Sequence, residues 1–145
     1  MGGLQISDIA HVIQLAVAPV FMLTAVGTLI AALNVRLGRA VDRRRVLEER
    51  LGGLGDAEAM DAREELLQIA RRVRTVYFAI LFAVLSGLFV CLLIAGAFIG
   101  AFVAMNLSRM IGALFVLAML ALIVCLLLFL REIFLAVTTP RHTPR

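Results

Sequence analysis

The chain has 145 residues, of which 63% are hydrophobic, and a mean hydropathy of +1.05. Soluble domains hold about 45–50% apolar residues, so this composition excludes an ordinary soluble domain and indicates an integral membrane protein. The formal net charge of +4 comes from fourteen arginines and no lysine, set against ten acids. Because these arginines lie between long apolar segments, they favour an anionic membrane surface over nucleic acid as the partner.

The first long apolar segment covers residues 15–35. These twenty-one residues carry no charge. At roughly 1.5 Å per residue they form a helix of about 31 Å, enough to cross a hydrocarbon core of about 30 Å. No helix breaker separates this segment from the charged residues 36–74. We therefore expect one continuous helix that crosses the membrane and extends into the cytosol.

The charged region 36–74 holds ten of the fourteen arginines and eight of the ten acids. A glycine-rich turn at 52–56 divides it into two arms of equal length, since glycine suits a helix end and a chain reversal. Apolar residues in both arms recur at alternating spacings of four and three, the heptad spacing typical of coiled-coil packing. The region is therefore predicted to form an antiparallel helical hairpin in the cytosol.

The heptad pattern also predicts the register of the hairpin. With Leu37 opposite Val73, antiparallel pairing places Arg45 beside Glu64 and Glu65. An exposed ion pair contributes only about 0 to 1 kcal/mol. We expect such pairs to select the register more than to stabilise the hairpin.

Basic residues near the base of the hairpin have two interpretations. They can bind anionic lipid headgroups, with about 1 kcal/mol from each arginine near the surface. Alternatively, they only set the membrane orientation and pair the two arms, which is the interpretation we favour. The candidate residues for these contacts are Arg36, Arg39, Asp42, Arg43, Arg44, Arg45, Arg71 and Arg72.

Two further apolar segments follow, at residues 76–102 and 110–130. Both are uncharged and long enough to span a bilayer, and the first is longer than a span requires, which indicates tilt or protrusion. A polar tail at 138–145 ends the chain. Small residues at every fourth position of the second span form a ridge that permits close helix packing. These residues are Gly96, Gly100 and Ala104.

The placement of the arginines predicts the orientation of the protein. Thirteen of the fourteen lie in the hairpin or after the third span, and only Arg109 lies in the turn between the second and third spans. By the positive-inside rule, the N-terminus lies outside and the C-terminus lies in the cytosol. Three spans put the two termini on opposite sides, as this orientation requires.

The polar residues do not assemble a catalytic site. The histidines, His11 and His142, lie on opposite sides of the predicted membrane, so neither can activate a shared nucleophile. Cys91 and Cys125 fall inside apolar segments at a spacing that suits neither a metal site nor a disulfide framework. The sequence has no phosphate loop, dinucleotide fingerprint or Cys-x-x-Cys motif. We expect no enzymatic activity, no cofactor and no metal.

One face of the first span carries small and polar residues. A helical wheel places most of them opposite the leucines that continue into the hairpin, which we expect to pack on the second span. This face can line a water-filled path through an oligomer, or it can pack on another helix with its threonine hydroxyls bonded to their own helix. We favour packing. The residues are Pro19, Thr24, Gly27, Thr28, Ala31 and Asn34.

Two parts of this region resemble a known family. The motifs are AP-x-F-x-LT at residues 18–24, followed by Gly27, and N-x-RL-x-R-x-x-DR at residues 34–43. They are similar to those of small bacterial three-span integral membrane proteins known only as a domain of unknown function. The resemblance covers nearly the whole chain in layout. It implies a bacterial inner-membrane location and no established activity.

The sequence therefore predicts an all-α integral membrane protein with one domain, three transmembrane helices and a cytosolic antiparallel hairpin. Small-residue faces on the first and second spans lead us to expect a homo-oligomer, because three helices leave these faces little to pack against. Two functions remain open. One is ion permeation or transport along the polar face of the first span. The other is a structural or regulatory role in which the hairpin docks a cytosolic protein or anionic lipid.

Overall fold

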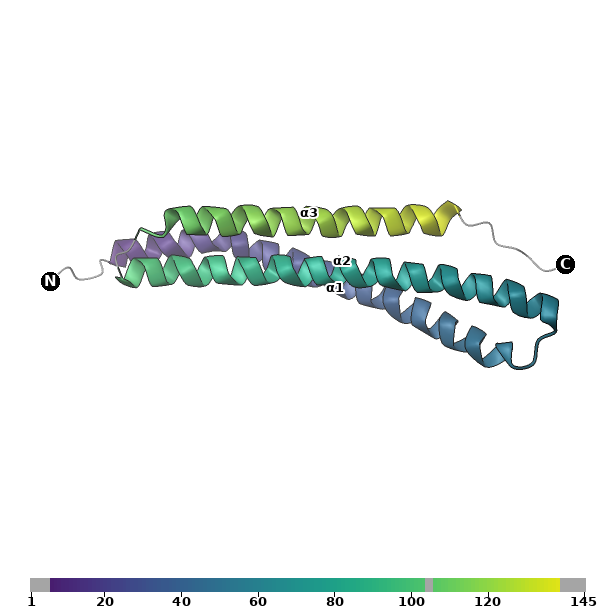
Figure 1. Cartoon of the computed structure of the whole chain (residues 1–145). Coiled ribbons are helices and arrows are strands. Elements are labelled where there is room, and N and C mark those ends of the chain that lie inside the picture. Colours follow the sequence, from purple (N-terminus) through teal and green to yellow (C-terminus); the bar gives the residue numbers. More distant parts are fainter. Residues whose placement is uncertain (1–5, 104–105, 139–145) are drawn as a thin grey trace. The chain divides into compact units, whose positions relative to one another are not determined.

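The computed structural model describes residues 6–103 and 106–138, and the regular structure in these ranges is entirely α-helical. Helix α1 covers Ile6–Leu51, α2 covers Asp56–Val103 and α3 covers Ser108–Thr138 (Figure 1). All three helices are long and apolar enough to cross a membrane. The predicted all-α fold with three spans is confirmed.

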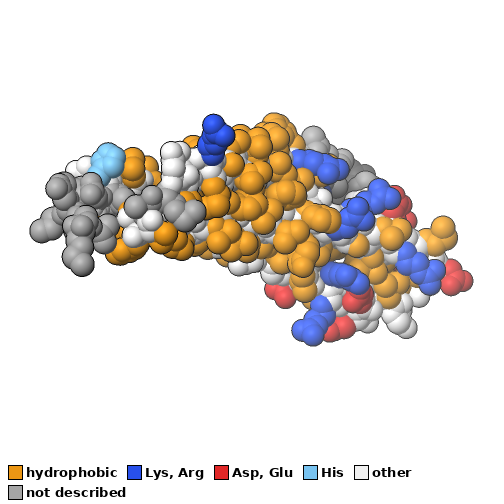
Figure 2. Space-filling view, turned by 60° about the vertical axis from the view of Figure 1, so that its left-hand side comes forward, with side chains coloured by type: hydrophobic (Ala, Val, Ile, Leu, Met, Phe, Trp, Pro, Cys, Tyr) orange, Lys and Arg blue, Asp and Glu red, His pale blue; other side chains and the backbone are white. Residues whose placement is uncertain are grey.

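Two of the helices are much longer than a bilayer is thick. With 46 and 48 residues, α1 and α2 are each about 70 Å long at 1.5 Å per residue, more than twice a hydrocarbon core of about 30 Å. The excess length forms a hairpin. In Figure 2 the acidic and basic side chains gather mainly over this hairpin, whereas apolar side chains dominate the rest of the visible face.

Backbone hydrogen bonds close the hairpin at both helix ends. The amide of Gly53 donates to the carbonyl of Arg50 at 3.1 Å, and the amide of Ala59 donates to the carbonyl of Gly55 at 2.9 Å. Two acids stand in the first turn of α2, where the helix dipole favours negative charge. The predicted helical hairpin is confirmed, with its turn at residues 52–55.

Helix contacts divide the chain into two compact units, and each unit contains part of every helix. The first unit consists of Met1–Ile30 and Phe82–Val124, and the second of Ala31–Leu81 and Cys125–Arg145. The hairpin belongs wholly to the second unit. The predicted polar tail, 138–145, lies outside the described residues except for its first position.

Small side chains make up much of the core of the first unit. Ser86 of α2 and Ala118 of α3 are fully buried, and the hydroxyl of Ser86 donates to the carbonyl of Ala118 at 2.8 Å. Small residues let helix backbones approach closely, which stabilises helix pairs in a medium without water. Among the residues of this unit whose burial the structure describes, the buried ones are Pro19, Val26, Ala83, Ser86, Val90, Leu93, Gly96, Ala118 and Ala121.

Burial repeats every seven residues along α2. Ala62, Ile69 and Val76 are buried in the second unit, and Ala83 and Val90 continue the same interval in the first. A seven-residue repeat keeps one seam of a helix against its neighbours. The predicted heptad spacing of the second arm therefore corresponds to a buried seam.

The leucine face of α1 also points inward in the second unit. Leu33 is fully buried. The partly buried residues that follow it are Leu37, Ala40, Leu47 and Leu51. The leucines among these residues belong to the face that the sequence predicts to pack on the second span.

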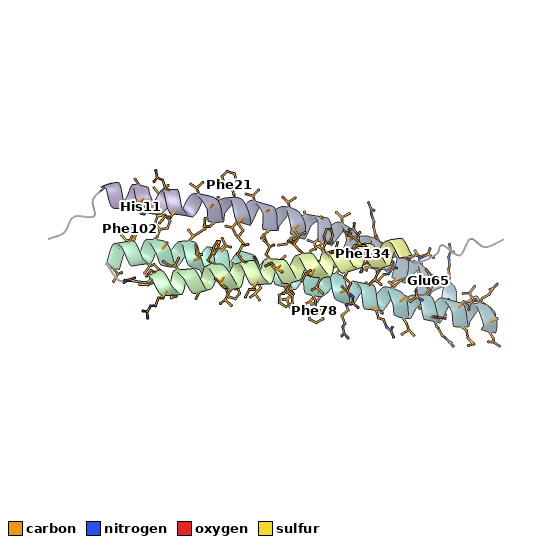
Figure 3. All side chains as sticks on the ribbon, turned by 90° about the horizontal axis from the view of Figure 1, so that it is seen from above. His11, Phe21, Glu65, Phe78, Phe102 and Phe134 are labelled. Carbon is orange, nitrogen blue, oxygen red and sulfur yellow. The ribbon has the colours of Figure 1, made fainter. Side chains whose placement is uncertain are left out.

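Many large apolar side chains of the spans remain exposed. Phe21 of α1 is 72% exposed and points away from α2 and α3 (Figure 3). Phe102 of α2 and Leu127 of α3 are exposed as well. A water-soluble monomer rarely leaves so much apolar surface uncovered, whereas lipid chains solvate it. The surface of the spans therefore suits a bilayer.

Candidate functional site

The polar face predicted on the first span lies at the surface of α1. Its exposed residues are Thr24, Gly27, Thr28, Ala31 and Asn34. Apart from its chain neighbours and the adjacent backbone of α1, no described atom would lie within 4 Å of a Cβ added to Gly27. The hydroxyl of Thr28 donates to the carbonyl of Thr24 at 3.0 Å, and that of Thr24 donates to the carbonyl of Val20 at 3.4 Å. Pro19 differs from the others because it is buried.

The small-residue ridge of the second span is covered in part by α3. A Cβ added to the buried Gly96 would lie 3.4 Å from the Cε of Met110 and 4.0 Å from Ile111. Gly100 is partly buried, and Ala104 lies outside the described residues. The expectation that this ridge is spare for a second subunit is therefore wrong at Gly96, because α3 of the same chain packs on it.

The charged residues of the hairpin pair in a register close to the predicted one. Glu65 of α2 (Figure 3) accepts hydrogen bonds from Arg43 of α1, with Nη2–Oε1 and Nε–Oε1 distances of 2.8 and 3.1 Å. The sequence places Arg45 beside Glu65, so the observed partner differs by two residues, about half a helical turn. Arg44 pairs with Glu48 of its own helix at 2.7 Å. Arg43 thus pairs across the two arms of the hairpin, whereas Arg44 pairs within its own helix.

Three other basic residues of the predicted set remain at the surface. Arg39, Arg45 and Arg71 are exposed, and none forms a salt bridge with a residue that the structure describes. Asp42 is also exposed. The residues predicted to contact lipid or the other arm of the hairpin therefore fall into two groups. Some form salt bridges within the hairpin, and others are exposed at its surface.

One carboxylate that the sequence does not single out is buried in the second unit. Glu132 of α3 is 8% exposed, and its Oε2 atom receives no hydrogen bond from any described residue. Three arginines act on it electrostatically, first Arg72 of α2, then Arg36 of α1 and Arg131 of α3. A buried charge is costly unless opposite charges compensate for it. Each helix therefore contributes one arginine near the buried carboxyl group, and we call these four residues the Glu132 cluster.

Two of these arginines hold α3 by further contacts. The Cζ atom of Arg36 lies 5.0 Å from the ring centroid of Phe129, a cation–π contact. The Nη2 atom of Arg72 donates to the backbone carbonyl of Leu135 at 2.9 Å. Carbonyls in the last turn of a helix have no partner within that helix, so this bond satisfies one of them. The cluster ties the end of α3 to both arms of the hairpin.

The chemistry of the Glu132 cluster is electrostatic. Its three arginines are positively charged, and positive charge attracts anions. Among the described residues, no group of three or more His, Cys, Asp or Glu side chains is placed to hold a metal ion. The cluster can therefore fix helices and bind an anion.

Comparison with known proteins places the chain in a family. A family model described as "Protein of unknown function (DUF2721)" matches residues 16–142. The chain belongs to this DUF2721 family. The match includes most of the first span, the hairpin, the other two spans and the Glu132 cluster, and it confirms the resemblance carried by residues 18–43. No curated protein and no solved structure matches the chain.

A sequence signal for Glu132 exists in this DUF2721 chain, although it is weak. Ala118, Cys125 and Glu132 are all buried and stand seven residues apart on α3. A seven-residue seam that continued past the last apolar residue would have predicted burial at position 132. The adjacent Arg131 instead suggests an exposed interfacial pair, which is how the sequence is most simply interpreted.

Proposed function

We propose that this DUF2721 protein is a non-catalytic component of the bacterial inner membrane whose hairpin docks a cytosolic protein. The N-terminus lies outside and the hairpin and C-terminus lie in the cytosol, as the arginine distribution favours. One observation carries the proposal. The hairpin exposes two large apolar side chains, Met60 and Leu67, which we call the Met60–Leu67 surface.

The Met60–Leu67 surface is the most exposed large apolar surface of the second arm. Met60 is 69% exposed and Leu67 is 64% exposed. Because they stand seven residues apart, they share one face of α2, whereas Ala62 and Ile69 form the buried seam. Full burial of a leucine or methionine side chain contributes about 1.5–3 kcal/mol. A partner that covers both side chains therefore gains a substantial part of its binding energy from them.

Charged neighbours indicate the chemistry of the partner. Arg71 and Arg74 follow Leu67 at helical spacing on the same face and are exposed. Neither forms a salt bridge with a residue in the described ranges. An amphipathic helix with apolar anchors and acidic flanks complements such a face. We assign the partner to this class.

Site-specific photocrosslinking in cells tests the docking proposal. A photoreactive amino acid at position 67 is expected to form an adduct with a protein other than a second copy of the chain. The same group at position 68 should not, because Gln68 is exposed on a different face of α2. Met60→Glu should reduce the position-67 adduct strongly, since it puts an acid into the contact, whereas the matched Gln68→Glu should leave it unchanged.

Two results would contradict docking. If position 67 crosslinks only to lipid, the hairpin lies on the membrane. If it crosslinks only to a second copy, the surface is an oligomer contact. In either case the protein does not act by docking a cytosolic helix.

Ion permeation in a homo-oligomer is a second candidate function. It is favoured by the exposure of Thr24, Thr28 and Asn34 on α1. A path along this face needs several copies, because a single helix cannot enclose water. We place it second because both threonine hydroxyls bond to carbonyls of their own helix. Hydroxyl groups that already donate a hydrogen bond to their own helix depend less on hydrogen bonds with water.

Purified protein in liposomes tests permeation. Under this hypothesis ion flux is measurable, and the variant Thr24→Leu/Asn34→Leu abolishes it. Val35→Leu serves as a control on the same helix, since Val35 is exposed and apolar. Absent flux, or flux that is indifferent to the double substitution, removes this candidate. Chemical crosslinking that yields only monomer in native membranes removes it as well.

A further inference from the structure

We infer that a second copy of this chain packs parallel to α1, along a row of six exposed residues that we call the α1 seam. They stand at alternating spacings of four and three and belong to the second unit: Ala31, Val35, Gly38, Asp42, Arg45 and Glu49. This contact goes beyond the docking function, because it lies on α1 and takes a second copy. Docking uses Met60 and Leu67 of α2 and takes another protein.

The α1 seam has the same period as the leucine face that packs inside the chain. Leu33 is fully buried and Leu37 is partly buried. Ala31 and Val35 stand two positions before them, and two positions correspond to about 200° around a helix. The arm therefore carries two heptad rows on opposite sides, and heptad rows pack on other helices. The described residues cover only the leucine row.

Exposed valines in the charged arm favour a helix as the cover of this face. Val41 and Val46 are 47% and 43% exposed. With Val35 at position a of a heptad and Gly38 at position d, Val41 of one copy lies beside Val46 of the other, at the positions that flank the row. A parallel pair thus removes apolar surface from its surroundings. A β-branched residue at position a also favours two strands.

Gly38 permits close approach of the two α1 helices. Apart from its chain neighbours and the adjacent backbone of α1, no described atom would lie within 4 Å of a Cβ added to it. A glycine inside a helix costs about 1 kcal/mol relative to alanine. No contact among the described residues requires that cost. A second helix whose backbone lies close to Gly38 does require it.

The charges of the α1 seam complement those of a second copy. Copies inserted in one direction have parallel α1 helices, and a twofold pair uses the same surface of both. Arg45 of one copy then lies between Asp42 and Glu49 of the other. None of these three residues forms a salt bridge with a described residue, whereas the adjacent Arg43 and Arg44 each form one. The unpaired charges therefore match a second copy in the same register.

Disulfide formation in native membranes tests the geometry of the pair. In the full chain without Cys91 and Cys125, a single cysteine replaces Ala31 or Gly38. Both variants should form disulfide-linked dimers under an oxidant, because equivalent residues of a parallel row face each other within the reach of a disulfide. Ala32→Cys is the matched control. Ala32 is also exposed but lies about 100° around the helix from Ala31, so this variant should remain monomeric.

Energy transfer between labelled copies in lipid vesicles measures the strength of the pair. Gly38→Leu should abolish transfer, because a leucine fills the space in which the helices approach. Its melting temperature should not fall, since leucine has the higher helix propensity and meets no other described residue. Ala32→Leu, off the row, should leave transfer unchanged. Unchanged transfer in Gly38→Leu would overturn the inference.

A charge reversal tests the register without altering the helix contact at Gly38. Arg45→Glu should weaken association about fivefold, given about 1 kcal/mol from the pairs that it removes. Arg50→Glu makes the same change at an exposed position beside the row and should have no effect. Equal weakening by both variants would mean that only net charge matters, and the assigned register would be wrong. Equal disulfide yields from Ala31→Cys and Ala32→Cys, or crosslinks only to a different protein, would exclude a second copy as the occupant.

Discussion

Leucine in place of Ala118 is expected to destabilise the packing of α3 on α2 by about 3 kcal/mol, the upper end of the range for an overpacked core. Ala118 is fully buried, and its carbonyl accepts the hydroxyl of Ser86 at 2.8 Å. A leucine side chain needs space that the close approach of the two helices does not leave. Rotamer changes cannot relieve this, because the space is limited by helix backbones. The apparent melting temperature in detergent should fall by roughly 6–12 °C.

Ala113→Leu is the matched control for this experiment. It makes the same change on the same helix, but Ala113 is exposed. Its apparent melting temperature should stay within about 2 °C of wild type, as expected for a surface substitution. If Ala118→Leu is as stable as Ala113→Leu, the close contact between α2 and α3 does not exist in the folded protein.

Removal of Glu132 is expected to have the second largest effect. Glu132→Ala leaves Arg72, Arg36 and Arg131 without the carboxylate that offsets their mutual repulsion. Removing one partner of a fully buried ion pair costs about 3–5 kcal/mol; because no described arginine forms a salt bridge with Glu132 and two of the three arginines are exposed, we expect a cost of about 2 kcal/mol. The apparent melting temperature should fall by roughly 4–8 °C. Proteolysis should also begin near the end of α3, because Arg72 and Arg36 hold that end.

An exposed acid of the hairpin provides the comparison for Glu132. Glu64 of α2 is exposed and forms no salt bridge with the residues described. Glu64→Ala should change the melting temperature by no more than about 2 °C, as expected for an exposed position. Equal stability of Glu132→Ala and Glu64→Ala would mean that the buried carboxylate does not hold the three helices together.

The fold could be predicted because its determinants are local. Uncharged runs such as residues 110–130 have a length fixed by the bilayer, and glycines at 52, 53 and 55 interrupt the heptads once. Spacings of seven residues then indicate which side of each helix is buried. Each of these signals can be counted along one segment without knowledge of its neighbours.

The side-chain partners were harder to predict because they depend on how helices meet. The sequence places Arg45 opposite Glu65, and a shift of two residues in register gives this partner to Arg43 instead. From the sequence, Gly96 is predicted to lie on an uncovered surface of small residues. In the structure Met110 of α3 packs against it. Such choices follow from three-dimensional packing, and spacing along one helix does not determine them.

The Glu132 cluster could not be predicted from the sequence for the same reason. Its members lie on three helices, and Glu132 lies 96 positions after Arg36 in a chain of 145 residues. Arg131 and Glu132 together resemble an ordinary charged end of a span. Only the meeting of α3 with both arms of the hairpin makes Glu132 a buried carboxylate among arginines.

Thiol accessibility at two positions tests the central claim most directly, namely that three spans carry a hairpin into the cytosol. In a background without Cys91 and Cys125, single cysteines replace Gly53 at the hairpin turn and Asn106 before α3. A membrane-impermeant thiol reagent should label Asn106→Cys in intact cells and Gly53→Cys only after permeabilisation. Labelling of both cysteines in intact cells, or of Gly53→Cys alone, would contradict the account.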